Sequence, residues 1–119
     1  MQLFLIRHAQ SANNLLWDQT GDNKGRSHDP ELTELGLRQA ACAAEFLRYG
    51  DPLDSQYTPG EKPARGFGIT HVYCSLMVRA VQTGAAIAGA LDLPLTAWPE
   101  VHETGGIYLD DEETGLPVG

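Results

Sequence analysis

Two arginines, a histidine and a glutamate lie at positions in this sequence where they could act together on a bound anion. They are Arg7 and His8, directly after the apolar run 2–6, then Arg79 and Glu103. Two guanidinium groups can hold a phosphoryl group by paired hydrogen bonds, and a neutral imidazole between them can attack phosphorus. A carboxyl group nearby can protonate the leaving oxygen and later deprotonate water. The residue types therefore predict phosphoryl transfer through a phosphohistidine.

A parallel β-sheet would bring these distant residues together, because the carboxyl ends of its strands share one edge, where ligands bind. The run 2–6 has the length and composition of a buried strand. Residues 69–74 are rich in β-branched and aromatic side chains and predict a second strand, and residues 95–98 predict a third. The site residues follow these three runs. We therefore expect an α/β fold with a mainly parallel sheet.

One helix is predicted between the first two strands. Thr33 is a good N-cap, and the helix should run to residue 47 or 49 and end near Gly50. Apolar and mostly small residues recur at helical spacing and should form its buried face: Leu37, Ala40, Ala41, Ala44 and Leu47. Because these side chains are small, the helix can lie close to a sheet.

A second helix is predicted from residue 76 to residue 91, with Ser75 as its N-cap. Its apolar face should contain Met77, Ala80, Val81, Gly84, Ala88 and Leu91. Arg79 falls in the first turns of this helix. Backbone N–H groups and the helix dipole favour an anion at that end, so we expect a ligand anion there.

Two long polar segments are predicted to be loops. The segment 15–31 carries Lys24, Arg26 and His28, for which a solvated surface is the favoured interpretation and ligand contact the alternative. The segment 50–68 contains three prolines and four glycines without a visible period. It predicts a long loop insertion, which could be a lid or a mobile surface loop.

Composition limits the possible functions. The 119 residues predict a single domain, 1–119, and the formal net charge of −8 argues against nucleic-acid or membrane-surface binding. No apolar run reaches the ~20 residues of a membrane span, so we expect a cytoplasmic protein. Cys42 and Cys74 have no metal-binding spacing and are interpreted as reduced thiols. We expect no metal and no cofactor.

Four stretches resemble, in order, the motifs of the histidine phosphatase superfamily, branch 1, also called phosphoglycerate-mutase-like proteins. LFLIRHAQSANN is similar to the family's strand followed by R-H-G-E-S-x-x-N, and LTELGLRQA is similar to L-T-x-x-G-x-x-Q-A. VYCSLMVRAVQTG is similar to Y-S-S-P-L-x-R-A-x-Q-T-A, and LPLTAWPEVHETGG resembles the stretch that holds the family's acid–base glutamate. These matches cover most of residues 2–106.

The resemblance implies a role for each matching residue. His8 would be the phosphorylated nucleophile, and Glu103 the general acid and base. Arg7 and Arg79 would bind the phosphoryl oxygens, with help from the Asn14 amide. The implied fold is a three-layer α/β/α sandwich. The implied substrate is a small phosphomonoester, with hydrolysis by a phosphatase favoured over a mutase reaction.

The chain also departs from the family pattern. Ala9 replaces the glycine after the nucleophile, and the family's second active-site histidine, on a late strand, has no match here because the last histidine is His102. We therefore expect an N-terminal fragment that lacks the C-terminal strands. A second copy, as a homodimer, or the missing C-terminal segment should complete it. The alternative function is a catalytically impaired phosphate-binding or regulatory module.

Overall fold

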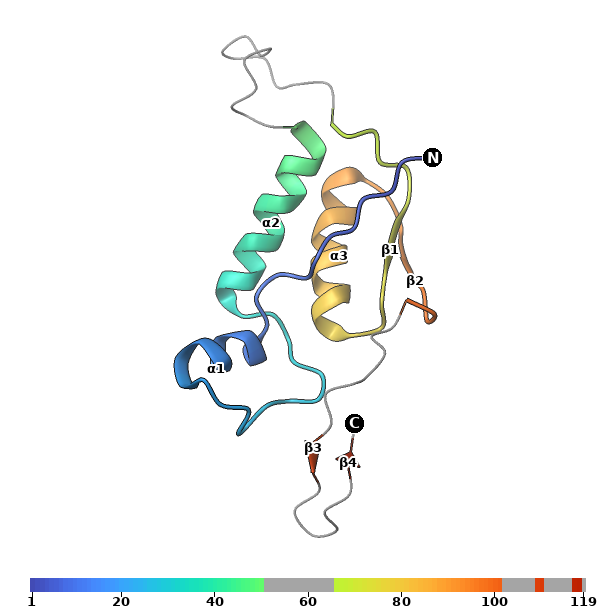
Figure 1. The fold of residues 1–119 in the computed structure, drawn as a ribbon. Helices are drawn as coiled ribbons and strands as arrows, with labels where there is room; N and C mark the ends of the chain where they lie inside the picture. The colour runs from blue at the N-terminus through green and yellow to red at the C-terminus, as the bar shows by residue number, and fades with distance from the viewer. Residues whose placement is uncertain (51–65, 102–108, 111–116, 119) are drawn as a thin grey trace.

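Two long helices packed beside a short parallel sheet form the body of the protein (Figure 1). The computed structural model describes residues 1–50, 66–101, 109–110 and 117–118. Its elements are α1 (Ala12–Thr20), α2 (Glu34–Tyr49), β1 (Val72–Cys74), α3 (Val78–Leu91), β2 (Leu95–Ala97), β3 (Leu109–Asp110) and β4 (Pro117–Val118). The predicted long loop falls mostly on residues 51–65, and Glu103 also lies outside the described residues.

The sheet of the body is a β-α-β unit. Strands β1 and β2 pair in parallel, with Val72 opposite Leu95 and Cys74 opposite Ala97. Parallel strands need a crossover connection, and α3 supplies it. The second and third predicted strands are therefore confirmed, although β1 is shorter than expected. Further along the chain, β3 and β4 form a separate antiparallel pair of two residues each.

Helix α3 lies directly against this sheet because it has a glycine at the contact. A Cβ added to Gly84 would lie 2.9 Å from Cδ1 of Leu95 and 3.4 Å from the Cβ of Cys74. Tyr73 points to the opposite face of the sheet, where it is exposed and its ring centroid lies 5.6 Å from that of Trp98. In the described part of the chain, helices thus cover one face of the sheet.

Helix α2 forms as its sequence predicts. The Thr33 hydroxyl accepts a hydrogen bond from the Gly36 N–H at the N-terminus, and Gly50 ends the helix with a φ of 84°. Ala44 and Leu47 of α2 pack against Ile87 of α3 to form the core, and Ala40 is also buried. The expected burial of two other residues was wrong: Leu37 is 52% exposed and Ala41 is also exposed.

Helix α1 occupies residues that were predicted to start a loop. Ser11 is its N-cap in a capping box with Asn14, and Gly21 ends it in the left-handed conformation with a φ of 64°. Both features are sequence signals of helix ends. The helix was missed because its residues are mostly polar and exposed, so that little apolar periodicity marks it.

The prediction of a buried strand over residues 2–6 was wrong. No residue of this run lies in a strand, and Leu3 and Leu5 are 72% and 89% exposed. Phe4 makes an edge-to-face contact with Phe67, 5.6 Å between ring centroids, so the run lies beside the segment that leads into β1 (Figure 1). A buried strand also needs a hydrogen-bonded neighbour and cover on both faces. No described residue of this run is hydrogen-bonded into a strand, and none of its side chains is fully buried.

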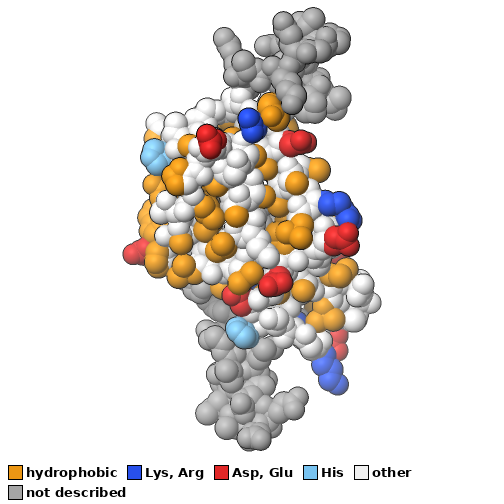
Figure 2. Space-filling view, turned by 180° about the vertical axis from the view of Figure 1, so that it is seen from behind, with side chains coloured by type: hydrophobic (Ala, Val, Ile, Leu, Met, Phe, Trp, Pro, Cys, Tyr) orange, Lys and Arg blue, Asp and Glu red, His pale blue; other side chains and the backbone are white. Residues whose placement is uncertain are grey.

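Large apolar side chains are exposed over much of the body. Figure 2 shows hydrophobic groups spread over the face opposite to that of Figure 1, with few charged groups among them. The exposed apolar residues include Leu3, Leu5, Ile6, Tyr73, Leu76, Trp98 and Val101. Where exposed apolar side chains form a contiguous patch, the patch is typical of a surface that binds another protein segment. Among the helices of the described residues, none has the length and apolar content needed to cross a bilayer.

We predict that the isolated chain associates with a second copy through its exposed apolar side chains. Sedimentation of the 119-residue chain should then show a dimer or a larger species. Leu5→Asp should weaken the association, because burial of one leucine side chain contributes about 1.5–3 kcal/mol. Leu5 is 89% exposed, so the variant should fold. Sedimentation of the unmodified chain as a stable, well-folded monomer would contradict the prediction.

The two cysteines should differ in reactivity. Cys42 is exposed on α2, whereas Cys74 is buried under α3, and burial raises the pKa of the Cys74 thiol. The thiolate is the reactive form, so we expect iodoacetamide at pH 8 to modify Cys42 at least about tenfold faster than Cys74. Peptide mapping of the native chain by mass spectrometry measures both rates. Equal modification rates of the two cysteines in the native chain would contradict the prediction. The denatured chain, in which both thiols are accessible, is the control and should show similar rates.

Candidate active site

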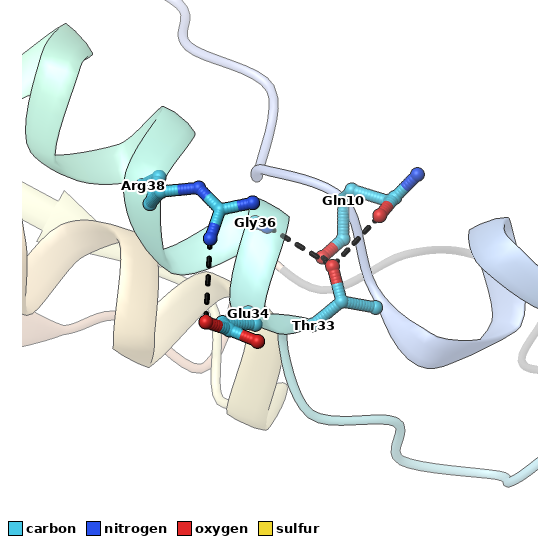
Figure 3. A network of polar contacts seen from close by, with 5 residues as sticks. All are labelled: Gln10, Thr33, Glu34, Gly36 and Arg38. Atoms are coloured by element: carbon cyan, nitrogen blue, oxygen red, sulfur yellow. Dashed lines mark hydrogen bonds and ion pairs between the residues drawn. The ribbon is translucent and has the colours of Figure 1, made fainter.

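The segment after the N-terminal run is held by hydrogen bonds to α2 and its N-cap residue. The Gln10 carbonyl accepts a hydrogen bond from the Thr33 N–H at 3.0 Å, and the Thr33 hydroxyl donates to Oε1 of Gln10 at 2.7 Å. The Gln10 N–H donates to Oε1 of Gln39 at 2.9 Å. Figure 3 shows Gln10 beside Thr33 and Gly36 at the start of α2. This end of α2 therefore fixes the backbone two residues after His8.

Helix α3 holds the residue next to His8. The Ala9 N–H donates to Oγ1 of Thr83 at 3.2 Å, and the Thr83 hydroxyl donates to the Arg79 carbonyl at 2.8 Å, one helical turn earlier. Thr83 and Arg79 are 5% and 4% exposed. The backbone beside His8 is thus linked through Thr83 to the helix that carries Arg79. The joint role of His8 and Arg79 stays a prediction.

The protonation of the His8 ring follows from its hydrogen bond. Its Nδ1 lies 2.7 Å from the carbonyl oxygen of Ala9. A carbonyl oxygen can only accept, so Nδ1 carries the proton in this contact. In the neutral ring, Nε2 then has the free lone pair. His8 is half-buried, and in this tautomer Nε2 carries no proton.

An open pocket of about 280 Å³ lies between α1, the loop that follows it and the N-terminal segment. It is lined by Arg7, Asn13, Asn14, Trp17, Asp18, Asn23 and Arg26. Two of the predicted phosphate-binding residues, Arg7 and Asn14, therefore share one pocket. Arg79 is not among its described lining residues. Glu103, the predicted acid–base group, lies outside the described residues, so its position relative to the pocket stays a prediction.

Asn14 also serves the structure of α1. Its Oδ1 accepts hydrogen bonds from the N–H and the hydroxyl of Ser11, at 3.0 and 2.9 Å. The side-chain carbonyl is therefore used by the capping box. Among the described residues the Asn14 NH₂ group donates to no partner, and it is the half that a phosphoryl oxygen would need.

Arg26 is a pocket residue that the sequence did not favour. It lies in the predicted solvated loop, but it is half-buried and lines the same pocket as Arg7. Its Nη1 donates to Oδ1 of Asn23 at 2.9 Å. Asn13 anchors the loop through a pair of hydrogen bonds to the Ser27 backbone, at 2.7 and 2.9 Å. Lys24 and His28 of the same loop are exposed.

A side chain of the protein occupies the start of α3, where a ligand anion was expected. Oδ1 of Asp29 accepts a hydrogen bond from the N–H of Val78 at 2.9 Å. The N-cap residue Met77 makes no side-chain cap bond, and the predicted cap, Ser75, lies two residues before it. A carboxylate at a helix N-terminus is favoured by the helix dipole. Asp29 therefore takes the place of the expected anion at Val78.

Comparison with known proteins defines the family. The sequence pattern of the histidine phosphatase superfamily (branch 1) matches residues 3–59 and 60–111. The chain belongs to branch 1 of this superfamily, which confirms the resemblance found in its motifs. Members of the family are phosphatases or mutases, so the enzyme class of the prediction is supported.

A protein of Yersinia pestis (strain Pestoides F), named probable phosphoglycerate mutase GpmB, is 31% identical over 103 residues. The match covers 87% of this chain and 38% of that protein, so the chain spans little more than a third of this relative's length. A solved structure, the mycobacterial glucosyl-3-phosphoglycerate phosphatase, has a TM-score of 0.53 at 24% identity. It matches over 92% of this chain and 40% of its own, and it confirms the α/β fold class.

The close contact between Gln10 and α2 predicts a strong effect at Gly36. A Cβ at this position would collide with the backbone carbonyl of Gln10, which cannot rotate away as a side chain could. Gly36→Ala should therefore lower the free energy of unfolding by about 1–3 kcal/mol. Urea unfolding followed by circular dichroism measures this change.

Gly89→Ala is the matched control for this prediction. Gly89 is also helical, and a Cβ there would meet nothing within 4 Å. Because alanine is the better helix former, this variant should gain about 0.5–1 kcal/mol. Equal free energies of unfolding for Gly36→Ala and Gly89→Ala would contradict the prediction, because the contact between Gly36 and the Gln10 backbone would then not contribute to stability.

Proposed function

We propose that the protein hydrolyses a small phosphomonoester through a phosphohistidine formed on His8. The hydrogen bond from His8 Nδ1 to the Ala9 carbonyl is the observation that carries this proposal, because it leaves Nε2 as the nucleophilic nitrogen. The shared pocket of Arg7 and Asn14, next to His8 in the chain, supports it. Membership of the histidine phosphatase superfamily supports the reaction class.

In the proposed first step, Nε2 of His8 attacks phosphorus and the bond from phosphorus to the ester oxygen breaks. Glu103 gives its proton to that oxygen, so the leaving group departs as an alcohol. Arg7 and Arg79, with the Asn14 NH₂ group, hold the equatorial oxygens, where negative charge is concentrated in the transition state. The nucleophile is thereby phosphorylated, and Glu103 is left as a carboxylate.

In the second step, a water molecule attacks the phosphohistidine. Glu103 takes a proton from this water, the bond between phosphorus and Nε2 breaks, and phosphate leaves. His8 and Glu103 return to their starting forms. Arg26 adds a second guanidinium group to the pocket wall, which supports a role in contacting the leaving part of the ester. The proposed location is the cytoplasm, where thiols such as the exposed Cys42 stay reduced.

Hydrolysis of a chromogenic aryl phosphate by the full chain tests this function. His8→Ala should lower kcat at least about 10³-fold, because it removes the nucleophile. His28→Ala, which changes an exposed histidine outside the pocket lining, should retain activity. Mass spectrometry after an alkaline quench should find the added phosphoryl group on His8.

Two other results would change the proposed function. Turnover that survives His8→Ala would exclude the phosphohistidine route. Micromolar binding of the aryl phosphate without turnover would support the alternative, a phosphate-binding or regulatory module.

A further inference from the structure

Both peptide groups that flank Ala9 are held by side chains from other elements. The peptide group between His8 and Ala9 donates its N–H to Oγ1 of Thr83 at 3.2 Å. The next peptide group, between Ala9 and Gln10, donates its N–H to Oε1 of Gln39 at 2.9 Å. Because a peptide group is planar, one hydrogen bond at its N–H also restrains its carbonyl.

The second of these peptide groups contains the carbonyl that accepts from the His8 ring. The Ala9 carbonyl oxygen lies in the same plane as the N–H held by Gln39 and receives Nδ1–H of His8 at 2.7 Å. Its direction therefore decides whether Nδ1 or Nε2 carries the proton of the neutral ring. A rotated plane would remove the acceptor and release the ring.

Thr83 is well suited to hold the first peptide group. Its hydroxyl proton is committed to the Arg79 carbonyl at 2.8 Å, so the oxygen presents its lone pairs to the Ala9 N–H. The side chain is 5% exposed, which protects both bonds from exchange with water. Thr83 thus joins the nucleophile's backbone to the helix that carries Arg79.

We propose that Gln39 and Thr83 are positioning residues for His8. They fix the two peptide groups around Ala9 and so keep the imidazole in its Nδ1–H tautomer, with Nε2 free to attack. Neither side chain touches the reacting atoms in this assignment. The kinetic part of the inference rests on the proposed function, whereas the tautomer is a property of the free protein.

The tautomer is measured directly by long-range ¹H–¹⁵N correlation of the histidine side chains in the full chain, assigned with His8→Gln. The unmodified protein should show His8 protonated at Nδ1 when the ring is neutral. Gln39→Leu and Thr83→Val should each shift His8 towards a mixture of tautomers. Gln39→Glu and Thr83→Ser retain the acceptor oxygen and should restore the signal. A neutral His8 protonated at Nε2 in the unmodified protein would overturn the proposal.

Kinetics give the second readout. Gln39→Leu and Thr83→Val should lower kcat for the aryl phosphate at least about tenfold, with KM changed less, because small misplacements of a reacting group are costly. Arg38→Gln is the matched control on the same helix, since Arg38 is exposed and its described contact is the 3.3 Å ion pair with Glu34 (Figure 3).

The outcomes separate the two proposals. Gln39 is exposed, so its variants should fold even if Thr83→Val does not. An unchanged tautomer in Gln39→Leu, or equal loss of kcat in Gln39→Leu and Gln39→Glu, would refute the positioning role. Absence of turnover in the unmodified chain, with the tautomer shifts as expected, would refute the proposed hydrolysis and leave the positioning role supported.

Discussion

The hydrogen bonding of residues 9–12 is the constraint on which the rest of the structure depends. Among the described residues this segment makes one isolated antiparallel bridge, Ser11 with Leu32, so its remaining backbone groups must find other partners or lose hydrogen-bonding energy on burial. Gln39 and Thr83 accept from two of its N–H groups, and the Ala12 N–H donates to the Glu31 carbonyl at 2.9 Å. The partners come from α2, α3 and the loop between α1 and α2. Those elements must therefore meet at one place.

The family motifs are explained as much by this meeting point as by chemistry. Thr33 caps α2 and also holds Gln10, and Gly36 lets the Gln10 backbone approach the helix. The Leu32 N–H donates to Oε1 of Gln82 on α3 at 2.8 Å. These glutamine and threonine side chains thus supply hydrogen bonds to the backbone that a regular strand would receive from its neighbour.

Elements with a local signal could be predicted from the sequence, and those that depend on distant partners could not. The cap at Thr33 and the glycine at Gly50 define α2 almost to the residue. The run 2–6 has the composition of a strand, but strand formation depends on neighbours that its own residues do not specify. In the site, Arg7 and Asn14 line one pocket, and their role stays a prediction. Arg26 carries no local signal for this pocket, because its position depends on the anchoring of the loop through Asn13.

The charge of the chain makes the local arrangement of cations decisive. With a net charge of −8, the protein as a whole repels phosphate esters, so binding must come from nearby donors. Asp29 already accepts from the N–H of Val78 and places a negative charge at the start of α3, so that helix end is a poor site for a second anion. Under the proposed function, anion binding therefore falls to side chains: Arg7 and Arg26 on the pocket wall, where Asp18 is the carboxylate among the described lining residues, together with Arg79. Guanidinium groups recognise phosphate oxygens by planar, directional hydrogen bonds, so the orientation of these side chains has to be fixed. The hydrogen bond from Arg26 to Asn23 is one way in which the loop after α1 meets that requirement.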